Sequence, residues 1–88
     1  MFLHLGATVT VPIDCVVGVF DLDTTTVSKN TRRYLEMAQK NEEIINIAED
    51  IPRSFILCNE GGKSVNYLSQ ISSQTLLKRM EENRYSDE

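Results

Sequence analysis

The sequence predicts one α+β domain, in which a small, largely antiparallel sheet carries two packed helices. Three observations predict this class. Two apolar runs at residues 55–58 and 65–68 flank a pair of adjacent glycines, which is typical of a β-hairpin. A continuous, mostly β-branched run fills residues 15–20, and apolar residues recur at helical spacing from residue 27 and again from residue 76. The expected element order is β-β-β-α-(β)-β-β-α.

The first part of the chain is predicted to form three strands. Residues 2–5 and 8–11 are short strands separated by a glycine, and the second alternates polar and apolar side chains. Pro12 should end it in a corner, because proline lacks an amide hydrogen. The run at residues 15–20 is apolar enough to be buried on both faces, so we expect it to be the central strand. Gly18 inside it indicates a bulge or a close backbone approach.

The middle of the chain contains the long helical pattern. Residues 23–28 supply candidate N-caps, and Asn41 is suited to the end of the helix. The apolar stripe consists of Val27, Thr31, Tyr34, Leu35 and Ala38. Residues 42–48 could extend this helix or form a short strand, and their β-branched isoleucines favour the strand. Pro52 places the residues before it in a loop, because a residue preceding proline avoids helical geometry.

The C-terminal part is predicted to be a hairpin followed by a helix. Residues 60–63, Glu-Gly-Gly-Lys, form the expected turn, since glycines adopt the positive φ angles of a tight reversal. Ser72 or Ser73 should cap the last helix, whose inward residues are expected to be Leu76, Leu77 and Met80. The domain therefore spans residues 1–82, and residues 83–88 are predicted to be a disordered tail because they have nothing to bury.

Length and charge restrict the classes of function. Eighty-eight residues with a net charge of −4 form one domain with a thin core, so we expect oligomerisation. A pI near 4.9 argues against a general nucleic-acid binder and leaves any such role to a local basic patch. No apolar run is long enough for a membrane span, and the opening residues lack the features of a signal peptide. We therefore expect a cytoplasmic protein with no membrane partner.

Few residues in the chain are suited to catalysis. His4 is the sole histidine, and it alternates with leucines, so it should lie on a strand surface. Cys15 and Cys58 lie in apolar runs, where a reduced thiol behaves as a small buried hydrophobe. Neither cysteine shares a metal-ligand spacing with the histidine or with the other cysteine. Residues 61–64, Gly-Gly-Lys-Ser, match only the end of a phosphate-binding loop and lie in a hairpin. We expect no enzyme, no cofactor and no metal.

The basic residues are the remaining candidates for a binding site. Lys29, Arg32 and Arg33 cluster on the predicted long helix, where exposed cations most often serve solubility. Arg53 differs from them because it follows a proline in a loop, where a side chain can be aimed at a partner. Spacing alone does not separate solubility from binding.

Several stretches of the chain resemble a known family. They are the opening FLHLG, the run DCVVGVFDL, the helix near residues 31–39 and above all PRSFILCNEGGKSVNYLSQISSQTLLKRM. Together they resemble the small RemA/RemB family of extracellular-matrix (biofilm) regulatory proteins from Gram-positive bacteria, and the RemB branch is the more similar. The resemblance covers nearly the whole chain up to Met80, and the hairpin-to-helix segment is its most specific part.

The resemblance implies a cytoplasmic, non-enzymatic regulator that binds double-stranded DNA, activates matrix genes and forms ring-shaped homo-oligomers. It also allows co-assembly with a related family member. A ring repeats a weak patch of arginines many times, so contacts to one duplex add up. The RemA branch carries an arginine-rich loop before the hairpin, whereas residues 49–54 here contain one arginine, Arg53, and two acidic residues.

Two hypotheses follow from the residues and the resemblance together. In the first, an oligomeric DNA-binding regulator contacts phosphates through Arg53 and through the basic helix residues Lys29, Arg32 and Arg33. In the second, the chain is an oligomeric protein-interaction scaffold that binds no nucleic acid. The two differ in salt dependence, because binding through phosphates weakens steeply as salt rises.

Overall fold

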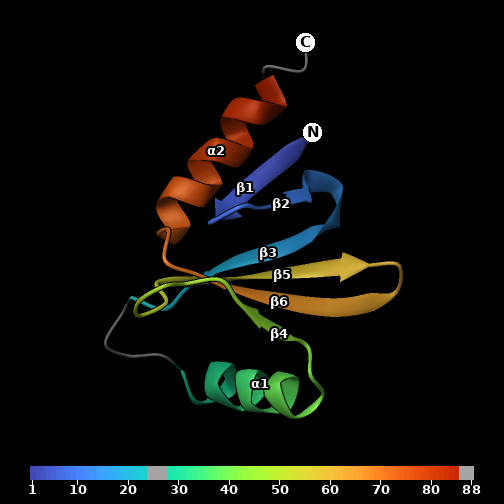
Figure 1. The fold of residues 1–88 in the computed structure, drawn as a ribbon, viewed down its shortest axis with the longest axis vertical. Helices are drawn as coiled ribbons and strands as arrows, with labels where there is room; N and C mark the ends of the chain where they lie inside the picture. Colours follow the sequence, from blue (N-terminus) through green and yellow to red (C-terminus); the bar gives the residue numbers. More distant parts are fainter. Residues whose placement is uncertain (24–27, 86–88) are drawn as a thin grey trace.

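The computed structural model describes residues 1–23 and 28–85, and the elements follow the predicted order (Figure 1). Its strands are β1 (Phe2–Gly6), β2 (Val9–Pro12), β3 (Val16–Asp21), β4 (Ile44–Asn46), β5 (Ser54–Glu60) and β6 (Lys63–Ser69). Its helices are α1 (Lys29–Lys40) and α2 (Ser73–Tyr85), and a short 3₁₀ helix, η1 (Ile13–Cys15), joins β2 to β3. The α+β class is confirmed, and the stretch at residues 42–48 contains a strand. Val27, the first member of the predicted helical stripe, lies outside the described residues.

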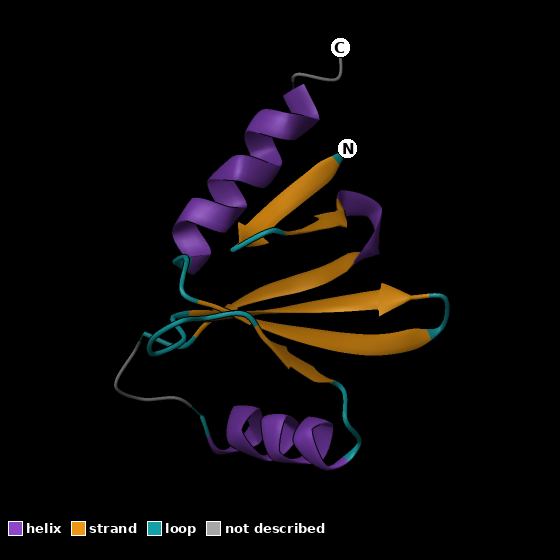
Figure 2. Ribbon diagram, viewed as in Figure 1, coloured by secondary structure: helices purple, strands orange, loops and turns teal. Residues whose placement is uncertain are grey.

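The strands of the described chain form two separate sheets (Figure 2). β1 and β2 pair as an antiparallel hairpin, and the larger sheet has the order β3-β5-β6-β4. β5 is antiparallel to both of its neighbours, whereas β4 runs parallel to β6. Figure 1 shows the β1–β2 hairpin and α2 on one side of the larger sheet and α1 on the other. The two faces of this sheet are therefore covered by different elements.

The prediction that residues 15–20 form the central strand is wrong. β3 lies at an edge of the larger sheet, and β5 and β6 occupy its centre. Gly18 does sit beside a bulge, because the register between β3 and β5 shifts at Val17. The Phe20 ring also lies within 2.8 Å of the position that a side chain on Gly18 would take. The apolar run at residues 15–20 indicates that both faces of the strand are apolar. It does not indicate whether the strand has one neighbour in the sheet or two.

The hairpin of β5 and β6 follows the prediction, with strands longer than expected. Gly61 and Gly62 form its turn with φ angles of +62° and +86°. Among the described residues, no atom lies within 4 Å of a Cβ added at either glycine, so backbone conformation and not crowding favours glycine here. The Asn59 side chain closes the turn, since its Oδ1 accepts from the Gly62 N–H at 3.0 Å.

The hydrophobic core lies between the larger sheet and the layer formed by the β1–β2 hairpin and α2. Its buried members are Leu3, Leu5, Val11, Ile56, Cys58, Tyr67 and Leu76. Ser69 also joins the two layers, because its hydroxyl donates to the Leu5 carbonyl at 2.6 Å and accepts from the Ile71 N–H at 3.0 Å. Packing and a buried hydrogen bond together attach the separate hairpin to the sheet.

α2 begins at the predicted position. The Ser72 hydroxyl caps it by accepting from the Thr75 N–H at 3.2 Å. Leu76 is fully buried and Met80 packs against the core. Leu77, predicted to face inward, is instead 47% exposed, because adjacent helical residues point about 100° apart and Leu76 already faces the sheet.

The last turns of α2 lie along the outer edge of β1. The Asn83 side chain donates to the Phe2 carbonyl at 3.0 Å, and Arg79 donates to the His4 carbonyl at 3.2 Å. These two side chains thus provide hydrogen-bond donors to backbone carbonyls of β1. The helix continues to Tyr85, past the predicted boundary at residue 82, and residues 86–88 of the predicted tail lie outside the described part of the chain.

Candidate nucleic-acid interface

Arg53 occupies an anchored backbone position immediately before β5. Its N–H donates to the Ser69 carbonyl at 2.8 Å, and its carbonyl accepts from the Leu22 N–H at 2.9 Å. These two bonds continue the hydrogen-bond ladder of β3, β5 and β6 by one residue before the start of β5. Pro52 also restricts the residue from the preceding side. The backbone of Arg53 is therefore held between two neighbouring strands, although it belongs to a loop.

The Arg53 side chain forms an ion pair with Asp23. Its Nε lies 2.9 Å from Asp23 Oδ2, and the two side chains are 52% and 40% exposed. Among the described residues no other group bonds the Arg53 guanidinium, so its terminal amino groups are available to a ligand. From the sequence, Asp23 is only one of several candidate helix caps, because a contact that spans 30 residues leaves no local pattern.

The other three predicted site residues lie together at the start of α1. Ser28 caps this helix, and its hydroxyl accepts from the Thr31 N–H at 3.1 Å. Lys29, Arg32 and Arg33 follow at a spacing that places them on one exposed face. The partial positive charge at the helix N-terminus adds to theirs.

Arg53 and the basic residues of α1 form two groups in the structure. In Figure 1 the start of α1 and the loop before β5 lie toward the same side of the molecule. Within the described residues, however, no hydrogen bond or ion pair joins Arg53 to α1. The connection between β3 and α1 includes residues 24–27, which are not described. In the structure, Arg53 therefore pairs with an acid, and only the three cations of α1 lie close together.

An apolar groove lies between α1 and the larger sheet, and we call it the Phe20 groove. It has a volume of about 270 Å³, and its lining includes Phe20, Tyr34, Phe55 and Leu57. The Phe20 and Phe55 rings stack with their centroids 4.6 Å apart. Phe20 is nevertheless 43% exposed, and it belongs to the edge strand β3. An exposed aromatic groove beside an open strand edge is a feature of surfaces that bind other chains.

Two polar side chains connect α1 to the sheet at this groove. The Tyr34 hydroxyl donates to Asn66 Oδ1 at 3.0 Å, and the Asn66 side-chain amide donates to the Glu43 carbonyl at 3.3 Å. Asn66 is fully buried, so these bonds satisfy an amide that would otherwise be costly. Sequence reasoning missed this residue, because an asparagine in a strand pattern indicates only a weak strand former.

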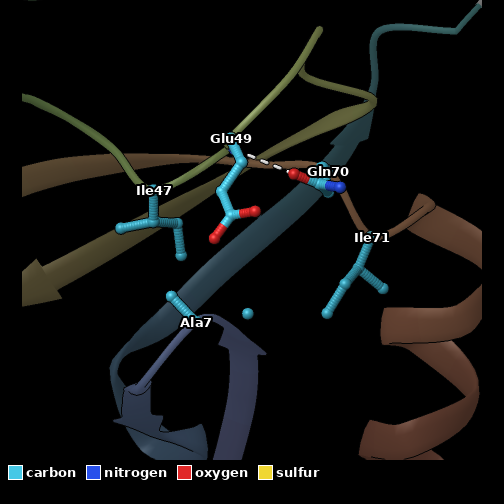
Figure 3. Close-up of a pocket in the computed structure, with 6 residues that line it drawn as sticks. Ala7, Ile47, Glu49, Gln70 and Ile71 are labelled. Carbon is cyan, nitrogen blue, oxygen red and sulfur yellow. Dashed lines mark hydrogen bonds between the residues drawn. The ribbon is translucent and has the colours of Figure 1, made fainter.

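A second cavity, of about 260 Å³, lies beside the loop that leads to Arg53. Figure 3 shows the Glu49 side chain extending between Ile47 and Ile71, toward Ala7. The backbone of Glu49 is held by Gln70, whose Oε1 accepts from the Glu49 N–H at 2.8 Å. A carboxylate in this position repels phosphate, so this cavity is unsuited to nucleic acid.

The candidates for catalysis are His4 and the two cysteines. His4 is exposed, with Nε2 3.1 Å from the Ala7 carbonyl oxygen. Burial raises the pKa of the Cys58 thiol to about 11, with smaller contributions from Glu60 and Cys15, so the thiol is neutral at ordinary pH. In the part of the chain that the structure describes, no three His, Cys, Asp or Glu residues are grouped to hold a metal ion.

A protein-family model matches most of the chain. The model of the RemA-like family, described as extracellular matrix regulatory protein A-like, matches residues 2–80. The matched segment contains both sheets, α1, the loop of Arg53 and α2 as far as Met80. No curated protein matches the chain. Among the described residues, neither helix is long and apolar enough to cross a membrane.

Proposed function

Because the chain belongs to the RemA-like family of extracellular matrix regulatory proteins, we propose that it is a non-enzymatic transcriptional regulator that binds double-stranded DNA as a homo-oligomer in the cytoplasm. The observation that carries the proposal is the half-exposed side chain of Arg53, which extends from an anchored backbone position beside the start of β5. The proposal is the same for the RemA and the RemB branch. Gene activation in a Gram-positive bacterium is the setting that the family resemblance implies.

Arg53 is suited to contact a phosphate. Hydrogen bonds on both sides hold its backbone, so binding through the side chain requires no further ordering of the backbone. Asp23 bonds only the Nε atom, which leaves the terminal amino groups to face a phosphate oxygen. Phosphate contacts of this kind position a protein on the duplex and carry no sequence information.

The basic face of α1 is the second element of the proposed interface. Lys29, Arg32 and Arg33 are all exposed on the first turns of the helix, where its dipole also attracts anions. Three cations on a subunit of net charge −4 are too few to hold DNA alone. The proposed binding therefore requires several copies that contact one duplex together.

The Phe20 groove supports the proposed self-association. β3 is an apolar edge strand, and in such strands unpaired backbone groups and exposed side chains favour pairing with another chain. Phe20 and Val17 are exposed on this strand, at 43% and 64%. A second copy that covers them would enlarge a core that is thin in one subunit. A closed ring of such contacts is the form that the family resemblance implies, and a related family member could join it as a further subunit.

DNA binding is tested by titrating a labelled mixed-sequence DNA duplex at several salt concentrations. We expect affinity to fall steeply with salt, and Arg53→Ala to weaken binding and to reduce the salt slope by about 0.9 for each phosphate that the variant no longer neutralises. Combined replacement of Arg32 and Arg33 by alanine should have a similar effect. Lys63→Ala, which removes an exposed cation at the hairpin tip, is the matched control and should change affinity little. If Lys63→Ala weakens binding as much as Arg53→Ala, the site assignment is wrong.

Self-association is tested by light scattering on the intact chain. Phe20→Ser should lower the particle mass toward that of one subunit, because it makes the Phe20 groove polar. Phe2→Ser removes a ring that is more exposed, at 61%, from the separate hairpin, and it should leave the mass unchanged. Thermal unfolding of both variants shows whether the fold is retained.

The second hypothesis, a scaffold that binds no nucleic acid, is favoured by one observation. Among the described residues, Arg53 forms an ion pair only with Asp23, whose carboxylate neutralises the charge of the arginine. A particle that assembles through the Phe20 groove but shows no salt-dependent binding to duplex DNA would establish the scaffold and rule out the regulator.

A further inference from the structure

Asp23 is placed opposite Arg53 by the fold itself. The Asp23 N–H donates to Asp21 Oδ1 at 2.7 Å, so a local turn sets the direction in which the chain leaves β3. Leu22, between them, donates its N–H to the Arg53 carbonyl at 2.9 Å. The residue before the acid is thus joined directly to the backbone of the base. The side-chain contact between Asp23 and Arg53, at 2.9 Å, follows from that placement.

The ion pair itself is too exposed to have a large role in stability. Its side chains are 52% and 40% accessible, and exposed ion pairs contribute little to folding because solvent screens them. The backbone ladder and the packed strands already hold this region without it. Because stability does not require this ion pair, we look for its role in the binding of a ligand by Arg53.

The effect of the contact on a phosphate ligand follows from charge. A phosphate that approaches the terminal amino groups of Arg53 also approaches the Asp23 carboxylate, which bonds the same guanidinium. The carboxylate repels the phosphate and neutralises the arginine, so each subunit binds more weakly than a free arginine would allow. Weak individual contacts make binding depend on many subunits at once.

We infer that Asp23 is an intramolecular competitor of the DNA phosphate for Arg53 and thereby sets the affinity of each subunit. This inference rests on the proposed function, because it assumes that Arg53 contacts DNA. Its consequence is that assembled particles bind DNA while isolated subunits do not. Removing the charge at Asp23 makes DNA binding depend less on assembly.

The experiment compares two substitutions that remove one negative charge. Asp23→Asn keeps an oxygen that can accept from Arg53 Nε, and Asp14→Asn makes the same charge change at an exposed aspartate in η1. With the labelled duplex, Asp23→Asn should raise affinity by about fivefold for each contact, the factor that corresponds to a unit-charge interaction across about 4 Å of water. Asp14→Asn should raise it much less. Light scattering checks that both variants keep the same particle mass.

A second pair of variants shows whether Asp23 acts through Arg53. In the Arg53→Ala background, Asp23→Asn should raise affinity no more than Asp14→Asn does. The inference is overturned if Asp23→Asn and Asp14→Asn act equally on the unmodified chain, or if Asp23→Asn weakens binding, since Asp23 would then position Arg53. If the parent chain binds no DNA, both the proposed function and the inference fail. If Arg53→Ala binds normally, DNA binding stands and the inference alone is overturned.

Discussion

The two faces of the larger sheet differ in how completely they are covered. On the face toward β1, β2 and α2, Ile56 and Cys58 are fully buried. On the face toward α1, the neighbouring β5 residue Leu57 is only partly buried and Phe20 is 43% exposed. Phe55, on the same face of β5 as Leu57, is only 3% exposed, so the α1 face is incompletely covered only beside Leu57 and Phe20. The first face holds most of the buried core, and the second leaves apolar side chains exposed beside the Phe20 groove.

The same contrast holds for the polar contacts. On the covered face, the Ser69 hydroxyl makes two hydrogen bonds and is fully buried. On the α1 face, the Tyr34 hydroxyl bonds Asn66, but the Tyr34 side chain borders the Phe20 groove and the residue is 38% exposed. Loss of the Ser69 hydroxyl removes the partner of two groups, whereas loss of the Tyr34 hydroxyl removes the donor to one, Asn66 Oδ1. We therefore expect the two faces to respond differently to substitution.

The largest expected effect tests burial directly. Ile56→Ala should lower the free energy of unfolding by about 2–5 kcal/mol, because it leaves a cavity in the core. Leu57→Ala, one residue along the same strand, should cost less than half as much, since its side chain borders an open groove. Urea denaturation of the two variants measures both values. Equal losses would show that the α1 face is as well covered as the other.

The polar contacts provide the next comparison. Ser69→Ala should cost about 1–3 kcal/mol, because it leaves the Leu5 carbonyl and the Ile71 N–H buried without this partner. Tyr34→Phe leaves one buried acceptor, Asn66 Oδ1, without this donor, so it should cost about 1 kcal/mol, less than Ser69→Ala. Both are measured by chemical denaturation. A larger loss for Tyr34→Phe would contradict the assignment of Ser69 as the main polar link.

A last expected effect is a loss of stability at alkaline pH. Burial, with Glu60 and Cys15 nearby, raises the pKa of Cys58 from 9.0 to about 11, and burial together with Glu60 raises the pKa of Tyr67 from 10.0 to about 12. Both groups stay neutral in the folded chain at pH values where the unfolded chain ionises, so stability is complete below pH 9 and falls as pH rises toward 12.

Between pH 7 and pH 10 the expected loss from Cys58 is about 1 kcal/mol. Denaturation curves recorded across this range measure it. Cys58→Ala lowers the overall stability but should remove most of this pH dependence. A Cys58→Ala variant that retains the full slope would assign the alkaline loss to other groups.

The local elements of the fold could be predicted from the sequence. Adjacent glycines between two apolar runs predicted the hairpin of β5 and β6. Ser28, one of the predicted N-cap candidates, caps the start of α1, and Asn41 ends the helix as predicted. Such signals depend on residues close in the chain, whose preferences act before tertiary packing. The site was predicted only as candidate residues: the sequence indicated Arg53 and the α1 cations, but not the acid that pairs with Arg53.

The sequence by itself determined the order of the elements, the turn at Gly61 and Gly62, and the helix caps, because each depends on the conformational preferences of neighbouring residues. Only the tertiary structure decided that β3 is an edge strand, that β1 and β2 form a sheet of their own, and that Asp23 faces Arg53. These features depend on contacts between distant segments. A run of apolar residues shows that a segment can be buried. Which neighbouring strand or helix covers that segment depends on the rest of the folded chain.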